Sequence, residues 1–571
     1  MRKLLLTFCL LLPLPLLAVS VDFVEPVDDA LQDNIRAHLA IVAAPLDCQL
    51  SDSYQKTVSK ALTKAAQALG YYQSQLQSID VPATKKCDQI NVSVQVGPRI
   101  HIANVILTLL GDGEQDKVLQ KLLQAFPLAN GDPLNQPKYD AAKTQLFSLS
   151  QRRGYFDARY TQQQIKINVA QQTADIELTL NTGSRYRFGE LQIPEQVKVQ
   201  QRIREVQTFK PGDYYLADTL AEFNKNLKLT GYFQQVLARQ VLSKAENHHV
   251  PIEVIVTHNP TDIFNVGGGA STDTGPRVRL KWQRPLANKY GHSMSADLFV
   301  SAPQQTLGFK YKIPLEDPLH NYLSLQTGVK AENDNDTKSE SITFAVKRHW
   351  GSDDEETWKK IAFIRFELEK FRQGLEPRET TQLLIPGFTF SRHRMRGGLD
   401  LSWGDYQEYT LEGTNTGLLS DIDLVRFNIQ QKWLRSIDEH RFFLRAEVGA
   451  IITNSFDQVP PSLRYFAGGD QSVRGFGFGT LSPREDGKLT GGRYLNVVSA
   501  EYSYPVSNEW RIAAFADVGN ASDEPLQNLA TGVGVGALWQ TVIGPVRFYI
   551  ARGNSEFDNT WRFHFSMGPA L

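Results

Sequence analysis

The order of hydrophobic and polar residues along the chain changes character once, near residue 262. Before that point, the segments 51–69, 137–153 and 216–230 carry apolar residues at the three- and four-residue spacing of an amphipathic helix. After it, apolar and polar residues alternate, as they do in a strand with one apolar and one polar face. The pattern predicts a front region of mixed helix and strand and a back region built from strands.

A glycine followed by two aromatic residues recurs three times in the front region, at residues 70–72, 154–156 and 231–233. Each copy ends a helical segment and precedes two strand-like segments. Glycine suits that position because it ends a helix in a left-handed cap. The repeat predicts three tandem modules of order β–α–α–β–β. Their expected boundaries are 21–97, 98–183 and 184–262.

The strands of the back region, residues 263–571, carry charge on one face. In Arg441–Ala450, for example, Phe442 and Leu444 share the apolar face while Arg445 and Glu447 share the other. A recurrence of this pattern through many strands favours a polar interior and a lipid-facing exterior. We therefore expect an all-β, antiparallel transmembrane barrel of about sixteen strands behind the α+β modules.

Composition narrows the class of protein further. A formal net charge of −1 over 571 residues gives no electrostatic footprint for nucleic acid. A mean hydropathy of −0.32 disfavours membrane-spanning helices outside the start of the chain. Residues 1–20 begin with Arg2 and Lys3 and continue as an apolar run, which predicts a removable secretory signal peptide. Cys48 and Cys87 would remain as a possible disulfide in an oxidising compartment, and whether they meet stays open.

The segment 466–479 packs five glycines around one cation, Arg474. Such a segment predicts a long loop that folds back onto an acidic partner, because glycine permits close backbone approach. Glu501 and Asp517 lie on the faces of their strands that oppose the apolar residues, so both are expected to point into the barrel. We predict that Arg474 pairs with both, since one guanidinium can donate to two carboxylates. The alternative is an ordinary charged loop arginine.

The first and last strands of the barrel both look weak. Gly267, Gly268 and Gly269 follow one another in the first, and the chain ends with Gly568 and Pro569 before its last two residues. Glycine weakens a strand and proline donates no ladder hydrogen bond. The sequence predicts a poorly bonded seam between these strands. Simple fraying of the ends is the alternative interpretation.

Several of these residues together resemble a known family. The segment formed by Val473, Arg474, Gly475 and Phe476 resembles the loop signature of the BamA/TamA outer-membrane assembly superfamily. The positions of Phe515, Asp517 and Gly519 resemble its Phe-x-Asp-x-Gly strand motif, and Glu501 sits where that family has a glutamate facing the lumen. The three repeats resemble its periplasmic POTRA domains, and three such units are typical of the TamA-type members.

The resemblance implies an outer-membrane protein of a Gram-negative bacterium, with residues 21–262 in the periplasm. It implies an assembly factor that inserts or secretes autotransporter-type β-barrel clients with a TamB-like, periplasm-spanning partner, in contact with outer-membrane lipid. Two alternatives stay open. One is a passive secretion pore of the two-partner type, and the other is phospholipid movement between membranes with the same partner.

An enzyme is the remaining class. The sequence contains no HExxH, no Gly-x-Ser-x-Gly and no phosphate-binding loop. Gly532, Gly534 and Gly536 alternate within a strand-like segment, so they are interpreted as small residues on one face. We interpret the acidic segment 352–356 as a solvated turn. No catalytic residue, metal site or cofactor is predicted.

Overall fold

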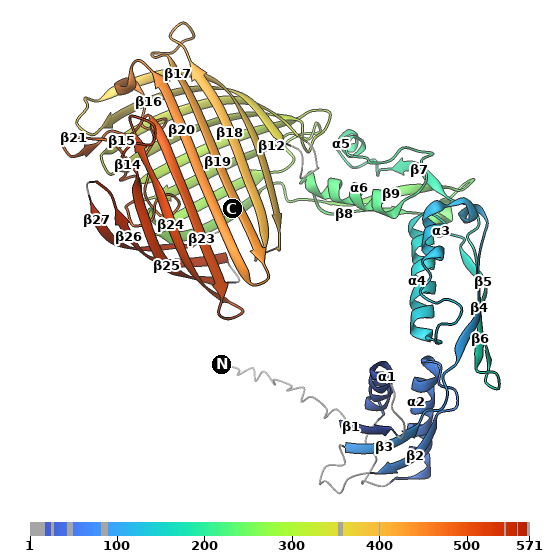
Figure 1. The fold of residues 1–571 in the computed structure, drawn as a ribbon. Helices are drawn as coiled ribbons and strands as arrows, with labels where there is room; N and C mark the ends of the chain where they lie inside the picture. The colour runs from blue at the N-terminus through green and yellow to red at the C-terminus, as the bar shows by residue number, and fades with distance from the viewer. Residues whose placement is uncertain are drawn as a thin grey trace, which may run out of the picture. The chain divides into compact units, whose positions relative to one another are not determined.

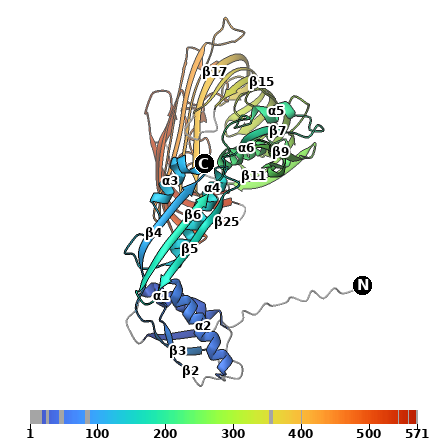
Figure 2. The same ribbon diagram turned by 90° about the vertical axis from the view of Figure 1, so that its right-hand side faces the viewer.

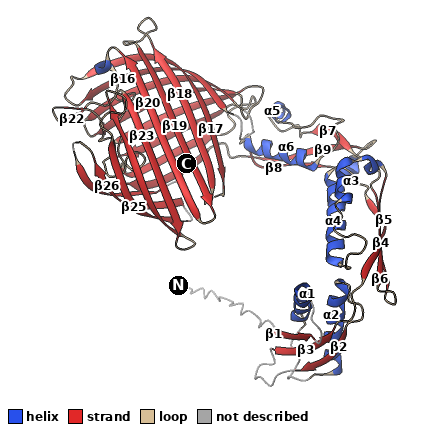
Figure 3. Ribbon diagram, viewed as in Figure 1, coloured by secondary structure: helices blue, strands red, loops and turns tan. Residues whose placement is uncertain are grey.

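The computed structural model describes residues 18–23, 28–42, 50–80, 89–351, 358–398, 400–541, 544–556 and 558–567. Three small α/β modules precede a closed barrel of sixteen strands, in which each strand is antiparallel to its sequence neighbours (Figure 1). Colouring by secondary structure shows α-helices in the modules and strands throughout the barrel wall (Figure 3). The predicted fold class is confirmed.

Each module has the predicted order β–α–α–β–β. The first contains β1 (Ala18–Phe23), α1 (Asp29–Ala40), α2 (Asp52–Ala68), β2 (Gln75–Asp80) and β3 (Gln89–Gln95). The second contains β4 (His101–Leu110), the short 3-10 helix η2 (Asp112–Gln115), α3 (Lys117–Gln124), α4 (Gln136–Arg152), β5 (Arg159–Asn168) and β6 (Thr173–Asn181). The third contains β7 (Arg187–Gln192), α5 (Gln200–Glu205), α6 (Ala217–Leu229), β8 (Phe233–Gln240), η3 (Leu242–Lys244) and β9 (His249–His258).

The three sheets share one topology. The last strand of each module lies in the centre, giving the orders β1-β3-β2, β4-β6-β5 and β7-β9-β8. In the second module the central strand β6 is parallel to β4 and antiparallel to β5, and the three run side by side in Figure 2. Two strands of every sheet therefore keep one edge unpaired by their own module. Open edges of this kind are templates for strand addition.

The recurring glycines end the helices as the sequence predicts. Gly70, Gly154 and Gly231 follow α2, α4 and α6 with φ of 91°, 88° and 72°, the left-handed region that glycine adopts without strain. At the other end of two of these helices, Ser51 and Asn135 accept hydrogen bonds from the backbone N–H three residues on. The aromatic residue after the glycine is buried in all three modules, where Tyr71, Tyr155 and Tyr232 pack inside.

Some of the sequence predictions fall wholly or partly on residues outside the described ranges. Residues 1–17 are among them, and β1 begins at Ala18, so the expected signal-peptide boundary at residue 20 falls within a strand. Cys48 and Cys87 also lie outside the described residues, as does the acidic segment 352–356. Among the described residues, no helix has the length and apolar character needed to cross a bilayer.

The barrel wall alternates as expected. The barrel strands are β10 (Ile263–Ser271), β11 (Gly275–Arg284), β12 (Ser293–Ser301), β13 (Gln304–Pro314), β14 (Tyr322–Asp334), β15 (Thr337–Trp350), β16 (Lys359–Gln373), β17 (Glu379–Arg396), β18 (Trp403–Thr414), β19 (Leu424–Ile437), β20 (His440–Thr453), β23 (Tyr494–Pro505), β24 (Trp510–Ser522), β25 (Ala530–Thr541), β26 (Gly544–Asn554) and β27 (Asn559–Met567). In β24, Ile512 and Val518 are exposed while Phe515 and Asp517 between them are buried. The apolar outer face and polar inner face are those of a membrane barrel.

The chain divides into two compact units. The first holds the first two modules and part of the third, and the second holds the rest of the third module and the barrel. Each module has its own apolar interior, as the cluster around Leu31, Val58 and Val92 in the first shows. The barrel unit has a separate buried cluster, which lies where a loop meets the inner wall.

Candidate functional site

The connection between β20 and β23, residues 454–493, is the longest loop of the barrel and folds into its interior. It includes the 3-10 helix η4 (Phe456–Gln458) and two short paired strands, β21 (Arg484–Glu485) and β22 (Lys488–Leu489). Loop residues Val459, Leu463 and Val473 form one buried cluster with Leu383 of β17 and Val497 of β23. We call this segment the inner loop, because its apolar residues pack against the lumen face of the wall.

Arg474, at the tip of the inner loop, is held by the wall formed by β23 and β24. Its Nε and Nη2 donate to the two carboxylate oxygens of Asp517 at 2.8 and 2.9 Å, and its Nη1 donates to Glu501 at 2.5 Å. Its backbone N–H also donates to Asp517, at 2.9 Å, and Nη2 reaches Ser499 at 3.1 Å. We call these four residues the clasp. Planar, charge-assisted bonds to two carboxylates are the arrangement that arginine supports and lysine does not.

The clasp is buried and lies between aromatic rings. The side chains of Arg474 and Asp517 are 5% and 0% exposed. The guanidinium carbon lies 3.5 Å from the ring centre of Phe515 and 4.7 Å from that of Tyr549. Cation–π contact adds to the ion pairs where water is scarce. A cavity of about 470 Å³ adjoins the clasp on one side and is lined by Glu501, Ser499 and Tyr549 among others.

The three alternating glycines of β25 form the floor under this arrangement. A Cβ added to Gly532 would meet the carbonyl oxygen of Arg474 at 1.9 Å. A Cβ on Gly534 would meet the Phe515 ring at 2.8 Å, and one on Gly536 would meet the Tyr549 ring at 2.2 Å. These three glycines form one face of β25 without side chains, because the loop and both rings pack where side chains would otherwise lie.

The neighbours of Arg474 in the loop contact other strands. Val473 is fully buried in the apolar cluster. Gly475 has φ of 97°, donates its N–H to His564 of β27 at 2.8 Å, and accepts from the Thr560 hydroxyl at 2.6 Å. Phe476 lies over Gly553 of β26, where a Cβ would approach its ring to 2.8 Å. In β24, a Cβ on Gly519 would meet the Asn496 carbonyl at 2.4 Å, so that glycine is required by the adjacent strand.

The seam between β10 and β27 differs from the rest of the wall. Among the described residues these two strands share one ladder pair, Ser271 with Ser566. On its other side β10 pairs with β11 at every position from Ile263 to Ser271. Gly267, Gly268 and Gly269 thus lie on a strand whose seam edge has no described ladder partner at their positions. Gly568 and Pro569 lie outside the described residues.

A few further hydrogen bonds cross the seam near Ser271. The Thr272 N–H donates to the Phe565 carbonyl at 3.0 Å, and its hydroxyl accepts from the Phe565 N–H at 3.2 Å. Arg277 donates to the Met567 carbonyl at 3.2 Å. The described contacts between the two strands are therefore concentrated at the end of β10 that is farther along the chain from the modules.

A model of the Omp85 superfamily domain matches residues 264–570, more than half of the chain. The chain belongs to the Omp85 superfamily. A second model, the POTRA domain of TamA domain 1, matches residues 23–96. The protein is thus an Omp85-type outer-membrane barrel whose N-terminal POTRA region lies in the periplasm.

Relatives of this Omp85 protein include two curated outer membrane protein assembly factors named BamA. That of Nitratidesulfovibrio vulgaris strain Hildenborough is 30% identical over 137 residues, which is 22% of this chain and 17% of the relative. That of Neisseria meningitidis serogroup B strain MC58 is 23% identical over 176 residues, or 28% of this chain and 22% of the relative. The matches thus span about a fifth of these relatives.

A solved structure shares the Omp85 fold over most of the chain. BamA from Haemophilus ducreyi lacking POTRA domains 1–3 has a TM-score of 0.68 and 17% sequence identity. The similarity covers 82% of this chain and 99% of that one. At this identity the likeness describes the fold, and the roles of individual residues rest on the contacts given above.

Several residues of this Omp85 site are not predicted from the sequence. Ser499 belongs to the clasp and Tyr549 lies against it, while Thr560 and His564 hold the carbonyl and N–H of Gly475. A partial signal existed, because the alternation of β27 sets His564 on the same face as Arg562, opposite Phe563 and Phe565. Which lumen residues meet the loop depends on how the strands are staggered around the closed barrel, and local alternation does not contain that information.

Proposed function

We propose that this Omp85 protein inserts or secretes β-barrel clients of the autotransporter type by opening the seam between β10 and β27. The observation that carries the proposal is the single described ladder pair between these strands. An opened seam offers unpaired strand edges, to which an incoming strand adds through main-chain hydrogen bonds. Membrane-spanning strands must pair, because an unsatisfied backbone group in lipid costs several kcal/mol.

The inner loop supports insertion over passive conduction. Its apolar residues pack against the lumen face, and Arg474 fixes its tip to the wall at Asp517 and Glu501. A passive polypeptide pore needs a continuous lumen, which this loop would have to leave. Single-channel conductance separates the two: the assembly proposal expects small, transient openings, and a large steady conductance would favour the secretion pore.

The test is a reversible lock on the seam. Ser271→Cys with Ser566→Cys places two thiols at the one paired position, where facing Cβ atoms lie within disulfide reach. We expect the oxidised variant to lose assembly of an autotransporter reporter and the reduced variant to recover it. Undiminished assembly with the disulfide formed would refute the seam as the route.

The matched control is a lock within a continuous ladder. Thr389 of β17 faces Thr410 of β18, and their hydroxyls lie 3.1 Å apart. Thr389→Cys with Thr410→Cys introduces the same bond and the same oxidation step away from the seam. This variant should assemble the reporter equally well in both redox states. Loss of assembly here as well would trace the effect to barrel rigidity.

We further propose that a TamB-like, periplasm-spanning partner adds to an open edge of a POTRA sheet. The support is the match of the first module to the TamA-type POTRA model, together with the edge strands β2 and β5. Photo-cross-linkers at the exposed Gln77 on β2 and Gln164 on β5 should capture the partner, whereas one at the exposed Lys60 on α2 should not. Capture from Lys60 alone would exclude edge docking.

Phospholipid movement with the same partner stays as the second use of this assembly. The seam lock distinguishes the two functions. Loss of client assembly with normal lipid composition of the outer membrane would favour protein insertion, and the reverse result would favour lipid transport.

A further inference from the structure

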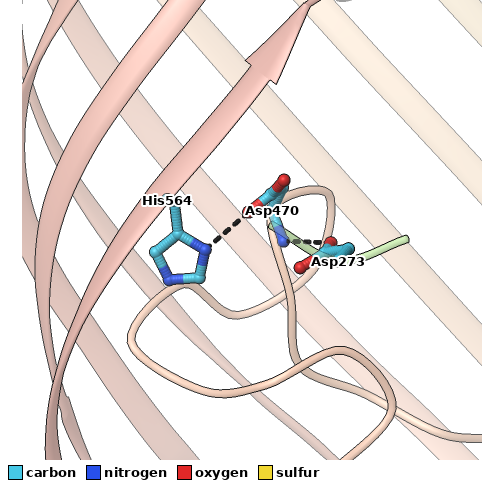
Figure 4. A group of neighbouring side chains, drawn as sticks. All are labelled: Asp273, Asp470 and His564. Carbon is cyan, nitrogen blue, oxygen red and sulfur yellow. Dashed lines mark hydrogen bonds and ion pairs between the residues drawn. The ribbon is translucent and has the colours of Figure 1, made fainter. Parts of the chain in front are cut away.

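Three side chains from distant parts of the chain meet beside the seam. Asp273 lies in the turn between β10 and β11, Asp470 lies in the inner loop, and His564 lies on β27 (Figure 4). A carboxylate oxygen from each aspartate and a ring nitrogen of His564 all lie within 4.8 Å of one another. This group is separate from the clasp, whose acids are Glu501 and Asp517.

The hydrogen bonds of the group leave two carboxylate oxygens unused. Asp273 accepts the Asp470 backbone N–H through Oδ2 at 2.7 Å, and Asp470 accepts the Thr272 hydroxyl through Oδ1 at 3.0 Å. Within the described part of the chain, Oδ1 of Asp273 and Oδ2 of Asp470 are buried and have no hydrogen-bond partner. The Asp470 side chain is 6% exposed.

Two carboxylates this close together, each with a buried and unused oxygen, need a compensating charge. A buried ionised group is normally paired or bound to a metal, because removing it from water is costly. Two oxygens that each lie about 2.4 Å from a shared Ca²⁺ ion are at most about 4.8 Å apart. One carboxylate oxygen of Asp273 lies within that distance of one carboxylate oxygen of Asp470, so the two side chains are close enough to share a cation.

His564 is already committed on both ring nitrogens. Its Nε2 accepts the Gly475 N–H at 2.8 Å, so the neutral ring carries its proton on Nδ1. That nitrogen then donates to Oδ1 of Asp470 at 2.6 Å. The histidine thus orients a carboxylate from outside the ion's own shell, a common arrangement around metal ligands. The free donors are carboxylate oxygens. Hard cations such as Ca²⁺ prefer oxygen ligands more strongly than zinc does.

We propose that Asp273 and Asp470 bind one Ca²⁺ ion between the β10–β11 turn and the inner loop. The two aspartates lie on a turn and a loop, and Ca²⁺ tolerates irregular oxygen geometry where Mg²⁺ demands a near-ideal octahedron. Through the bond from His564 to Asp470, a bound ion connects both strands of the seam. The role of this connection at the seam rests on the proposed function, whereas the binding site itself does not.

Calorimetric titration of the full-length protein in detergent tests the site. After removal of divalent ions, Ca²⁺ is titrated into wild type and into Asp273→Asn and Asp470→Asn. Wild type should bind one Ca²⁺, and the affinity of each variant should be lower by roughly tenfold or more. The exposed acid Asp486, in the β21–β22 turn, supplies the control Asp486→Asn, which should bind as wild type does. Equal affinity in wild type and the double variant overturns the proposal.

Ion identity gives an independent check that does not depend on how the variants fold. Wild type should prefer Ca²⁺ to Mg²⁺ and to Zn²⁺. Tighter binding of Zn²⁺ that is lost in His564→Gln would overturn the assignment of an oxygen site. Failure of wild type to bind Ca²⁺ at millimolar concentration would overturn it as well.

The link to the seam has its own measurement. Hydrogen exchange of the β27 amides, in particular that of Phe565, should slow on addition of Ca²⁺ in wild type and not in Asp470→Asn. Ca²⁺ binding with unchanged exchange would keep the site and refute its hold on the seam. Unchanged client assembly in the locked Ser271→Cys/Ser566→Cys protein would instead refute the proposed function while leaving the calorimetric result intact.

Discussion

The two sides of the inner loop meet the barrel in different ways. On one side β23 and β24 pair from Tyr494 to Pro505 without interruption, and Arg474 adds a buried, multiply bonded ion pair to that wall. On the other side the loop reaches β10 and β27, which share one described ladder pair. The same loop is thus fixed to a continuous wall and linked by a few side chains to the seam.

This difference assigns separate tasks to the two sides. A barrel that opens at one position needs the remainder of its wall to stay closed, and the clasp contributes to that closure where the loop would otherwise be free. The seam side uses backbone and side-chain contacts that are few enough to break together. If the tasks are divided in this way, stability depends on the clasp wall while the seam strand tolerates change.

The largest effect is expected for the clasp itself. Arg474→Ala leaves Asp517 buried without the guanidinium that neutralises it, and breaking a buried ion pair costs roughly 3–5 kcal/mol. The adjoining cavity admits solvent and would reduce that cost. Thermal unfolding followed by circular dichroism in detergent should show a lower Tm. Arg484→Ala, in an exposed part of the same loop, should leave Tm unchanged. Equal Tm values for the two variants would show that the clasp does not stabilise the barrel.

A glycine comparison separates the two sides more directly. A methyl group at Gly532 would overlap the Arg474 carbonyl, whereas one at Gly267 of β10 meets no atom within 4 Å. Forcing a methyl group into a packed site costs about 1–3 kcal/mol. Gly532→Ala should therefore lower Tm and displace the loop, while Gly267→Ala should leave Tm equal or higher. The reverse order would contradict the distinction between a required and a tolerant strand.

The aromatic contact gives a smaller effect on the clasp side. Phe515→Leu keeps an apolar side chain of similar size but removes the ring that lies 3.5 Å from the Arg474 guanidinium. The lost cation–π contact is worth about 0.5–2 kcal/mol at a desolvated site. Tm should fall by less than in Arg474→Ala. In the Arg474→Ala background the same substitution should cost less, and a fully additive double variant would show that the ring acts independently of the cation.

The sequence predicts the barrel wall more completely than it predicts the site inside the barrel. Two-residue alternation sets Glu501 and Asp517 on the inner face, and the glycine after each helical segment marks the end of α2, α4 and α6, because both signals are local. The contacts of Tyr549 and His564 with the loop depend on the closure and stagger of strands far apart in the chain. Asp273 lies in a turn and Asp470 in a loop, and neither segment has a periodic pattern. The sequence therefore gives no sign that the two residues lie close together.

The smallest effect is expected in a module, where a similar pair lies in a water-exposed domain. Asp116 caps α3 by accepting the Val118 N–H at 2.9 Å, and it also accepts from Arg153 at 2.8 Å and Tyr155 at 3.0 Å. Burial alone would raise the pKa of Asp116, but these three hydrogen bonds outweigh it and lower the pKa below its ordinary value. A lowered folded-state pKa means that the carboxylate stabilises the module above the unfolded pKa of about 3.9.

That stabilisation should be lost as the pH falls through the folded-state pKa. Asp116→Asn keeps an oxygen that caps the helix, but it removes the charge and puts an amide NH2 donor where Oδ2 accepts from Arg153 and Tyr155, so we expect a loss near neutral pH of about 1 kcal/mol. Hydrogen exchange of the α3 amides, corrected for the intrinsic rate, should show protection in wild type that falls below about pH 4. In Asp116→Asn the protection should be lower at neutral pH and should lack this acid-dependent component. An equal acid-dependent fall in both proteins would show that Asp116 is not its source.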